Sequence, residues 1–470
     1  MYIDRYEAVL RALNETIWSA AETRFEEETS VAAQINLLEQ AGYAVERGVA
    51  GMDTAYVAVI GSGKPVIGLL AEYDALDGLS QQANLCEYKP RPETTKGHGC
   101  GHNLLGTGVI GAALVLRDYI QNQGLSGTVK IFGCPGEEGG SGKVFMARAG
   151  LFDDVDVALT WHPSTMNAVM TGSMLANVQA YFRFHGTSAH AGAAPHLGRS
   201  ALDAVELMDV GVNYMREHME MTDRVHYAIT ETGGRSPNVV QSYAEVIYLI
   251  RSRTTEGAKR LYERVCNIAR GAAQMTETTV EIIFDKACSQ VVPNHVISKL
   301  FHDCMSELGL PPRTQEEREY VKRFSATMPA EIVANDPGQL PPDYQVQARK
   351  KLVAEHPDGE FILPFAPVES VVCASSDMGD VSCIAPLVQL QTACFALGTQ
   401  PHSWQWVAQG TSEFAIHGTL YAGQIMAETT KRLLEQPELV EKAREEWQMR
   451  TGGSAYVCPI PDDVSPKVPK

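Results

Sequence analysis

The chain has 470 residues, of which 44% are apolar and 20% are charged, and 57 Asp and Glu against 39 Lys and Arg give a net charge of −18. This composition is that of a globular protein with a sizeable core, and the length allows about three domains of roughly 150 residues. Nucleic acid and anionic membranes are bound by clustered Lys and Arg, and the sequence contains no basic run. We therefore expect neither as a partner.

The longest apolar stretch, residues 104–116, is shorter than the roughly 20 residues that cross a bilayer, so we expect no membrane span. The first residues show early acids and helical periodicity instead of the pattern of a signal peptide. The ten cysteines have no regular spacing, which in a chain without an export signal indicates reduced thiols. These features predict a cytoplasmic protein.

Apolar residues at helical spacing predict two helices within the first forty residues. Strand-like apolar runs follow, and they alternate with helices predicted near 102–119 and 143–149. The runs lie at residues 56–60, 66–70, 128–132 and 155–161. Near-continuous apolar strands between helices favour an α/β fold with a mostly parallel sheet. We assign residues 1–175 to the first part of this main domain.

The pattern changes over residues 176–288. Alternating or helically spaced apolar residues predict, in order, a strand, a helix, two strands, a helix and a strand. This order is that of a ferredoxin-like (βαββαβ) module, so we predict an inserted domain. Residues 289–470 return to the α/β pattern, with a helix near 296–308, a strand at 391–397 and a helix near 413–434.

Two segments of the second part differ from this pattern. Residues 311–365 are rich in Pro, Glu and Gln, as in PPRTQEE and DPGQLPPDY. We expect them to form a surface excursion or a partner-facing element. The tail CPIPDDVSPKVPK is interrupted by prolines, and we expect it to be irregular.

Polar clusters follow three of the predicted strands: AEYDAL at 71–76, CPGEEGGSG at 134–142 and WHP at 161–163. Open α/β sheets bind ligands at the carboxyl ends of their strands, so these clusters can converge on one crevice. A fourth cluster, KGHGCGHN, precedes the helix at residue 102. Its Cys100 and His102 can direct a thiolate and an imidazole at one metal ion. A turn with a buried cysteine is the alternative.

Glu137 and Glu138 are adjacent acids at a predicted strand end. Their side chains point in different directions, so one can bind a metal while the other takes a proton from water. His162 and His402 each follow an apolar strand, and either alone is more often a structural histidine. Together with Cys100, His102 and one glutamate, they give five donors, which are enough for a two-metal site.

The inserted domain contributes three further candidates. His190 lies in a loop of small residues, SAHAGAAP, where a ligand could approach, or it is an ordinary loop histidine. Asn238 in SPNVV and Arg251 at the end of YLIR could bind a carboxylate, because a guanidinium offers two donors in a fork. For Arg251, an ion pair at the strand end is the alternative.

Six ordered motifs resemble those of the metal-dependent amidohydrolase, aminoacylase and carboxypeptidase superfamily, in its branch with a cysteine in the metal motif. They are GLLAEYDAL, GHGCGHN, GCPGEEGGSGKVFM, DVALTWHP, HAGAAPHLGRSALDA and GTQPHSW. The resemblance runs over nearly the whole chain. It implies a split catalytic domain with two divalent metal ions, Mn or Zn, and an inserted domain that acts as a lid and dimerises.

The resemblance also implies roles for single residues. The implied metal ligands are Cys100, His102, Glu138, His162 and His402, with Glu137 as the general base. Asp74 is expected to orient a ligand histidine from outside the metal site. His190 is expected to reach the site of a neighbouring subunit and stabilise the oxyanion, and Asn238 and Arg251 are expected to bind the substrate carboxylate.

The expected reaction is hydrolysis of the amide of an N-acyl or N-aroyl amino acid, with p-aminobenzoyl-glutamate the best single candidate substrate. Three alternatives stay open: an indole-acetyl-amino-acid hydrolase, a dipeptidase, or a subunit that is active only with a related A-type partner. We expect a homodimer, with a hetero-oligomer as the alternative. The sequence departs from the family pattern at Asn103, where many relatives have Asp, and in the length of residues 311–365.

Overall fold

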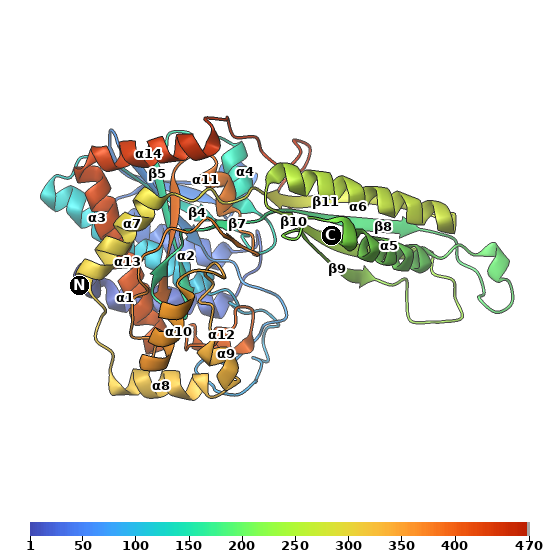
Figure 1. Ribbon diagram of the computed structural model, residues 1–470, viewed down its shortest axis with the longest axis horizontal. Helices are drawn as coiled ribbons and strands as arrows, with labels where there is room; N and C mark the ends of the chain where they lie inside the picture. The colour runs from blue at the N-terminus through green and yellow to red at the C-terminus, as the bar shows by residue number, and fades with distance from the viewer. Residues whose placement is uncertain (468–470) are drawn as a thin grey trace.

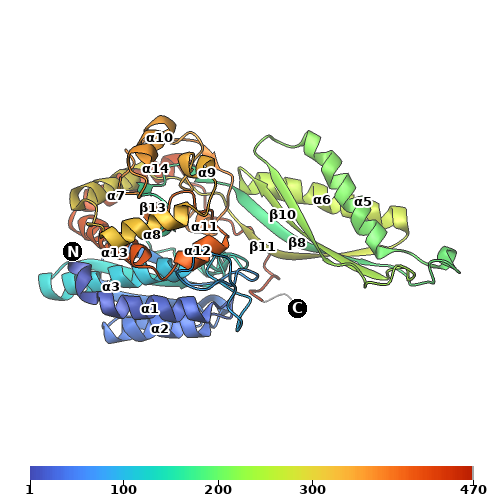
Figure 2. The same ribbon diagram turned by 90° about the horizontal axis from the view of Figure 1, so that it is seen from below.

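The computed structural model describes residues 1–467. A body built around a seven-stranded sheet carries a narrower unit, built on a four-stranded sheet, that extends from one side (Figure 1). The same two parts are seen side by side after a turn of 90° (Figure 2). Within residues 1–467, no helix is long and apolar enough to cross a membrane.

The seven-stranded sheet has four parallel strands at its centre and antiparallel strands at both edges. In spatial order the strands are β1 (Ala44–Arg47), β2 (Tyr56–Ser62), β4 (Gly127–Cys134), β3 (Val66–Glu72), β5 (Val157–Ser164), β13 (Leu387–Ala393) and β6 (Ala168–Val169). Every residue of β3 is buried, as expected of a central parallel strand covered on both faces. The predicted α/β fold with a parallel central sheet is confirmed.

Helices cover both faces of this sheet. They are α1 (Glu7–Ala20), α2 (Glu28–Gln40), α3 (His102–Gln123), α4 (Gly142–Arg148), α7 (His295–Leu308), α11 (Met378–Ser382), α12 (Trp404–Gln409), α13 (Glu413–Glu435) and α14 (Pro437–Thr451). Helix α3 packs closely on the sheet because it is rich in small residues: a Cβ at Gly108 would lie 2.7 Å from the indole of Trp161. This contact fixes the start of α3 next to the end of β5.

The strand predicted at residues 391–397 is displaced. The observed β13 begins four residues earlier and ends at Ala393. The next two residues, Cys394 and Phe395, both donate their backbone N–H to the carbonyl of Ser164. Two consecutive donors on one acceptor turn the chain out of the sheet, although residues 394–397 stay buried. Apolarity alone therefore extended the predicted strand too far.

The four-stranded sheet is antiparallel in the order β11-β8-β10-β9. Its strands are β8 (Ala176–His185), β9 (Arg224–Glu231), β10 (Tyr243–Ser252) and β11 (Thr279–Cys288), and its helices are α5 (Ala201–Met215) and α6 (Thr255–Thr276). Alternate residues of β8, such as Ala180, Phe182 and Phe184, are buried against these helices. The opposite face of β8 carries Asn177 and Gln179, which line a cavity at the junction with the body.

Residues 311–365 contain three helices, α8 (Gln315–Ser325), α9 (Ala330–Ala334) and α10 (Val346–Glu355). The segment has its own apolar cluster, in which Tyr344 and Leu363 pack with Met166 and Leu397 of the body. Glu317 fixes the start of α8: its carboxylate accepts from the backbone of Thr314 and from the Nδ1 of His417, both at 2.8 Å. The segment is thus packed on the body.

Two short strands, β7 (Ser173–Met174) and β12 (Val371–Val372), pair beside the cavity. The tail predicted to be irregular contains no helix or strand in residues 458–467, and residues 468–470 lie outside the described residues.

Candidate metal centre and active site

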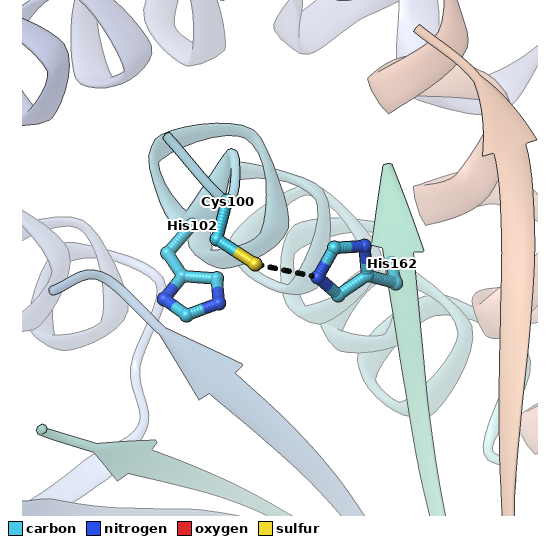
Figure 3. Close-up of side chains that lie close together, drawn as sticks. All are labelled: Cys100, His102 and His162. Atoms are coloured by element: carbon cyan, nitrogen blue, oxygen red, sulfur yellow. Dashed lines mark hydrogen bonds between the residues drawn. The ribbon is translucent and has the colours of Figure 1, made fainter. Parts of the chain in front are cut away.

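Cys100 and His102 are placed by the glycine between them. Gly101 is the N-cap of α3 and has a left-handed φ of +85°, a conformation that favours glycine. The thiol of Cys100 forms a hydrogen bond of 3.3 Å with the Nε2 of His162, which comes from β5. Figure 3 shows the thiol pointing toward this ring, with the ring of His102 beside it.

Five predicted ligands meet in two groups of three. The ligand atoms of Cys100, His102 and His162 lie within 4.8 Å of one another, and so do those of Cys100, Glu138 and His402. Cys100 belongs to both groups. The structure therefore brings all five residues together, with the thiol at their common point.

His402 reaches this point from an irregular loop. Its φ of +59° is unusual for a residue with a Cβ, and such strain is concentrated at functional sites. Its backbone N–H donates to the carbonyl of Gly99 at 2.8 Å, which ties the loop to the Cys100 segment. Hydrogen bonds to Cys100 and Glu138 raise the pKa of His402 to about 11, so the surrounding donors favour a positive charge here.

Asp74 holds two of these residues in place. One oxygen accepts from the Nδ1 of His102 at 2.8 Å, and the other accepts from the backbone N–H of Glu138 at 2.9 Å. This contact fixes the His102 ring and leaves its Nε2 directed at the cluster. A carboxylate behind a ligand histidine is a common arrangement in metal sites.

A buried ion-pair chain, absent from the sequence prediction, lies behind the cluster. The side chain of Lys143 is fully buried, and its Nζ lies 2.6 Å from both Glu72 and Asp377. Glu72 in turn places an oxygen 3.2 Å from the Nε2 of His102. Burial alone would lower the pKa of Lys143, but Asp377 and Glu72 outweigh it and raise this pKa well above its ordinary value.

The two adjacent glutamates differ in their electrostatic surroundings. Burial, and after it the charges of Glu72 and Asp377, raise the pKa of Glu137 to about 8. Burial would also raise the pKa of Glu138, but the hydrogen bond from His402 and the histidine charges lower it to about 2. Glu138 is thus a stable carboxylate, whereas Glu137 can exchange a proton near neutral pH.

These side chains line a cavity of about 340 Å³ between the body and the four-stranded sheet. Arg251 lines it from the end of β10, where the register places it beside Asn177 of β8. Two further lining residues, Lys286 and Ser375, were not singled out from the sequence. Arg251 is therefore where the sequence prediction expected it, at the metal-binding cluster.

His190 and Asn238 lie elsewhere. Both are exposed, and the backbones beside them are joined by a bridge between His190 and Val239. They belong to loops at the end of the sheet where Tyr243 opposes His185, whereas Arg251 opposes Asn177 at the other end. Eight residues of β10 at ~3.3 Å each separate the two ends by about 26 Å. One chain does not bring His190 and Asn238 to its own cavity.

Asn103, the departure from the family pattern, faces away from the cluster. Its amide donates to Asn14 at 2.8 Å and to the carbonyl of Gly410 at 2.9 Å. The residue is buried between α1 and the loop before α13, where it joins these elements.

The donor set suits divalent cations. His102 Nε2 and Glu138 Oε1 are buried and form no hydrogen bond with the described residues. Orphaned buried polar atoms are rare because each costs about 1–3 kcal/mol. Thiolate, imidazole and carboxylate are ligand types of zinc, and the last two also suit manganese. Cys100, His102, Glu138, His162 and His402 could therefore hold two such ions.

Comparison with known proteins identifies the family. The description "Peptidase family M20/M25/M40" matches residues 68–337, more than half of the chain. The chain belongs to this family. It is also 46% identical over 457 residues to the B-type subunit of p-aminobenzoyl-glutamate hydrolase from Escherichia coli, with 96% of this chain and 94% of the relative aligned. The resemblance drawn from the six motifs is confirmed, and this M20 member is a hydrolase of amide bonds.

Solved structures share the fold. The aminobenzoyl-glutamate utilization protein from Klebsiella pneumoniae is 19% identical, with a TM-score of 0.59 over 93% of this chain and 98% of that one. A Bacillus subtilis protein described as a dinuclear metal binding peptidase from the M20 family is 17% identical, with a TM-score of 0.53 over 92% and 99%. At these identities the M20 neighbours establish the fold alone.

Proposed function

We propose that this M20 hydrolase cleaves the amide of N-acyl or N-aroyl amino acids, with p-aminobenzoyl-glutamate as the substrate. The carrying observation is the pair of three-donor groups that share Cys100 and lie beside Glu137 in one cavity. The name of the relative with 46% identity supports the choice of substrate. The guanidinium of Arg251, which borders the cavity and pairs with no acid among residues 1–467, supports a substrate with a carboxylate.

Two divalent ions, Mn or Zn, would be held by Cys100, His102, Glu138, His162 and His402, with the thiolate between them. Bound there, they would make a water molecule more acidic and polarise the substrate carbonyl. The dinuclear metal binding of the B. subtilis relative supports this stoichiometry. Asp74 acts as a positioning residue, because it fixes the ring of His102 and the backbone of Glu138.

Glu137 performs the proton transfers in this proposal. It takes a proton from the attacking water and delivers it to the nitrogen of the leaving amine. Its pKa of about 8, raised by burial and by neighbouring carboxylates, makes both directions accessible near neutral pH. Arg251 binds the carboxylate of the amino-acid half and thereby orients the amide.

The domain organisation enters the same proposal. We assign residues 1–175 and 289–470 to a split catalytic domain and residues 176–288 to a ferredoxin-like lid that also dimerises. In a dimer, His190 of one chain would stabilise the oxyanion in the site of the other, and Asn238 would approach that same site. The long distance between these residues and Arg251 of their own chain supports action across subunits.

The lid has a surface suited to a second copy. Strand β9 is an edge of its sheet, and its Tyr227 and Ile229 are about 40% exposed. Leu207, Val210 and Tyr214 form an exposed apolar stripe on α5. An open edge and an apolar stripe are features that a partner covers. A homodimer satisfies both, and a related A-type subunit is the alternative, because the E. coli relative is named as the B-type member of a hydrolase whose A-type member is also similar to this chain.

We also assign the protein to the cytoplasm, because all ten cysteines are free thiols. Such thiols persist in a reducing compartment.

The test is hydrolysis by the purified single chain. Release of p-aminobenzoate from p-aminobenzoyl-glutamate is measured with added Mn²⁺ or Zn²⁺ and after chelation, next to indole-acetyl-aspartate and a dipeptide panel. We expect metal-dependent release, fastest with p-aminobenzoyl-glutamate. Activity only after addition of an A-type subunit would replace the homodimer by a hetero-oligomer. No release under either condition would refute the proposed substrate.

Action across subunits has its own assay. His190→Ala and Glu137→Gln chains, each inactive, are mixed after mild dissociation. Random pairing makes half of the dimers mixed, and each mixed dimer has one complete site of two, so about a quarter of the wild-type rate returns. A mixture that stays inactive while mixed dimers form would place His190 outside the reaction.

A further inference from the structure

Two cationic side chains line the cavity without a carboxylate partner. Arg251 and Lys286 both border it, and neither forms an ion pair with an acid among residues 1–467, although many surface cations of the chain do. Lys286 is 6% exposed. A buried ammonium without a counter-charge is strongly unfavourable in a folded protein. The arrangement therefore calls for a ligand with more than one negative group.

The strand register directs both cations at the same space. Arg251, Asn177 and Cys288 form one row across three strands, and Leu249, Gln179 and Lys286 form the next row on the same face. A bulge at Asp285 shifts the register of β11 and turns Lys286 to this face, a common effect of β-bulges. Strand spacing of ~4.8 Å and rise of ~3.3 Å put the two α carbons about 12 Å apart.

This separation suits two carboxylates on one small ligand, since each long side chain spans roughly half of it. Two polar atoms beside the cations also lack partners within the described part of the chain: the Nε of Arg251 and the Oδ1 of Asn177, whose residue is 5% exposed. The Lys286 ammonium donates to the backbone carbonyl of Glu138, at 3.1 Å. That bond holds the ammonium next to the reaction centre and leaves its other protons available to a ligand.

We propose that Lys286 makes the enzyme selective for acidic amino acids: it binds the side-chain carboxylate of the leaving glutamate or aspartate, while Arg251 binds its α-carboxylate. The inference rests on the proposed amide hydrolysis and names the leaving half of its substrate. An ammonium at a fixed position discriminates a carboxylate from the isosteric amide, because only the carboxylate neutralises it.

The test compares p-aminobenzoyl-glutamate with p-aminobenzoyl-glutamine, which has the same shape and one carboxylate fewer. We expect the wild type to prefer the glutamate substrate by about 30-fold in kcat/KM, chiefly through KM. Lys286→Met should reduce this preference to about threefold or less, and Lys286→Arg should restore part of it. Lys299→Met, at an exposed lysine paired with Asp303 on α7, is the matched control and should keep the wild-type preference.

A structural role for Lys286 gives a different result, since loss of its bond to Glu138 would lower both substrates equally and leave their ratio unchanged. Product inhibition of the wild type is independent of any variant: L-glutamate should inhibit at least tenfold more strongly than L-glutamine. Hydrolysis of both substrates at equal rates, or equal inhibition by both products, would overturn the role of Lys286 while the proposed amide hydrolysis stands. Hydrolysis of neither would refute the proposed function itself.

Discussion

The buried ammonium of Lys143 offers the sharpest test of the architecture behind the cluster. Its side chain is fully buried, with Glu72 and Asp377 each 2.6 Å from the Nζ. Both carboxylates are also buried, at 6% and 1% side-chain exposure. Lys143→Met keeps the length of the side chain and removes its charge, so two acids lose the cation that compensates them.

The magnitude follows from this geometry. Removing one partner of a buried ion pair costs about 3–5 kcal/mol, because the remaining charge stays desolvated. In folding units of 150–250 residues, 1 kcal/mol corresponds to about 2–4 °C in Tm. We therefore expect Lys143→Met to lower the Tm by about 6–20 °C. Adding Asp377→Asn should recover part of the loss, since it removes one of the two uncompensated charges.

The assay is thermal unfolding followed by circular dichroism. Lys130→Met is the matched control: Lys130 pairs with Asp154 at 2.7 Å, but that carboxylate is 55% exposed. Exposed pairs contribute at most about 1 kcal/mol, which corresponds to no more than about 4 °C. Equal Tm values for the two single variants would refute the reasoning, and a double variant less stable than Lys143→Met would contradict the charge argument.

Two further predictions concern the metal ligands and the 311–365 segment. Cys100→Ser should lose bound metal by elemental analysis, because the thiol is common to both donor groups; Cys304→Ser, at a buried cysteine of α7, should keep it, and metal retained by Cys100→Ser would remove the thiol from the site. Hydrogen bonds to His417 and the Thr314 backbone outweigh burial and lower the pKa of Glu317 to about 2, so its stabilisation is complete above its unfolded pKa of about 4.5 and is lost as the pH falls toward 2. Glu317→Gln should therefore lower the Tm at pH 6 and match the wild type near pH 2; a difference that does not shrink with acid would mean that the charge of Glu317 is not what secures α8.

The ligand cluster was predictable because its residues stand at the carboxyl ends of parallel strands or beside glycines. Cys100, Glu138 and His162 converge for that reason, and an apolar strand followed by a polar motif is visible in the sequence. The α/β fold was predictable on the same grounds. The inserted segment was recognisable from its change to alternating burial, which β8 shows in the structure.

The charged groups behind the cluster were not predictable. Lys143 follows GGSG at the start of a short helix, where a lysine is ordinarily solvated; only tertiary packing places it against Glu72, 71 positions earlier. Lys286 gains its direction from a bulge that sequence periodicity does not reveal. Asn238 and Arg251 were expected on one carboxylate, but strand length separates them, because both ends of β10 carry plausible binding residues.

Glu137 carries the central claim of the proposed reaction, and Glu137→Gln tests it most directly. Metal content and turnover of p-aminobenzoyl-glutamate are measured on the same preparation, with the wild type beside it. We predict unchanged metal content and turnover reduced by about 10²–10⁴-fold, the usual contribution of a general base. Turnover within tenfold of the wild type, with metal retained, would contradict the assignment of Glu137 as the group that moves the proton.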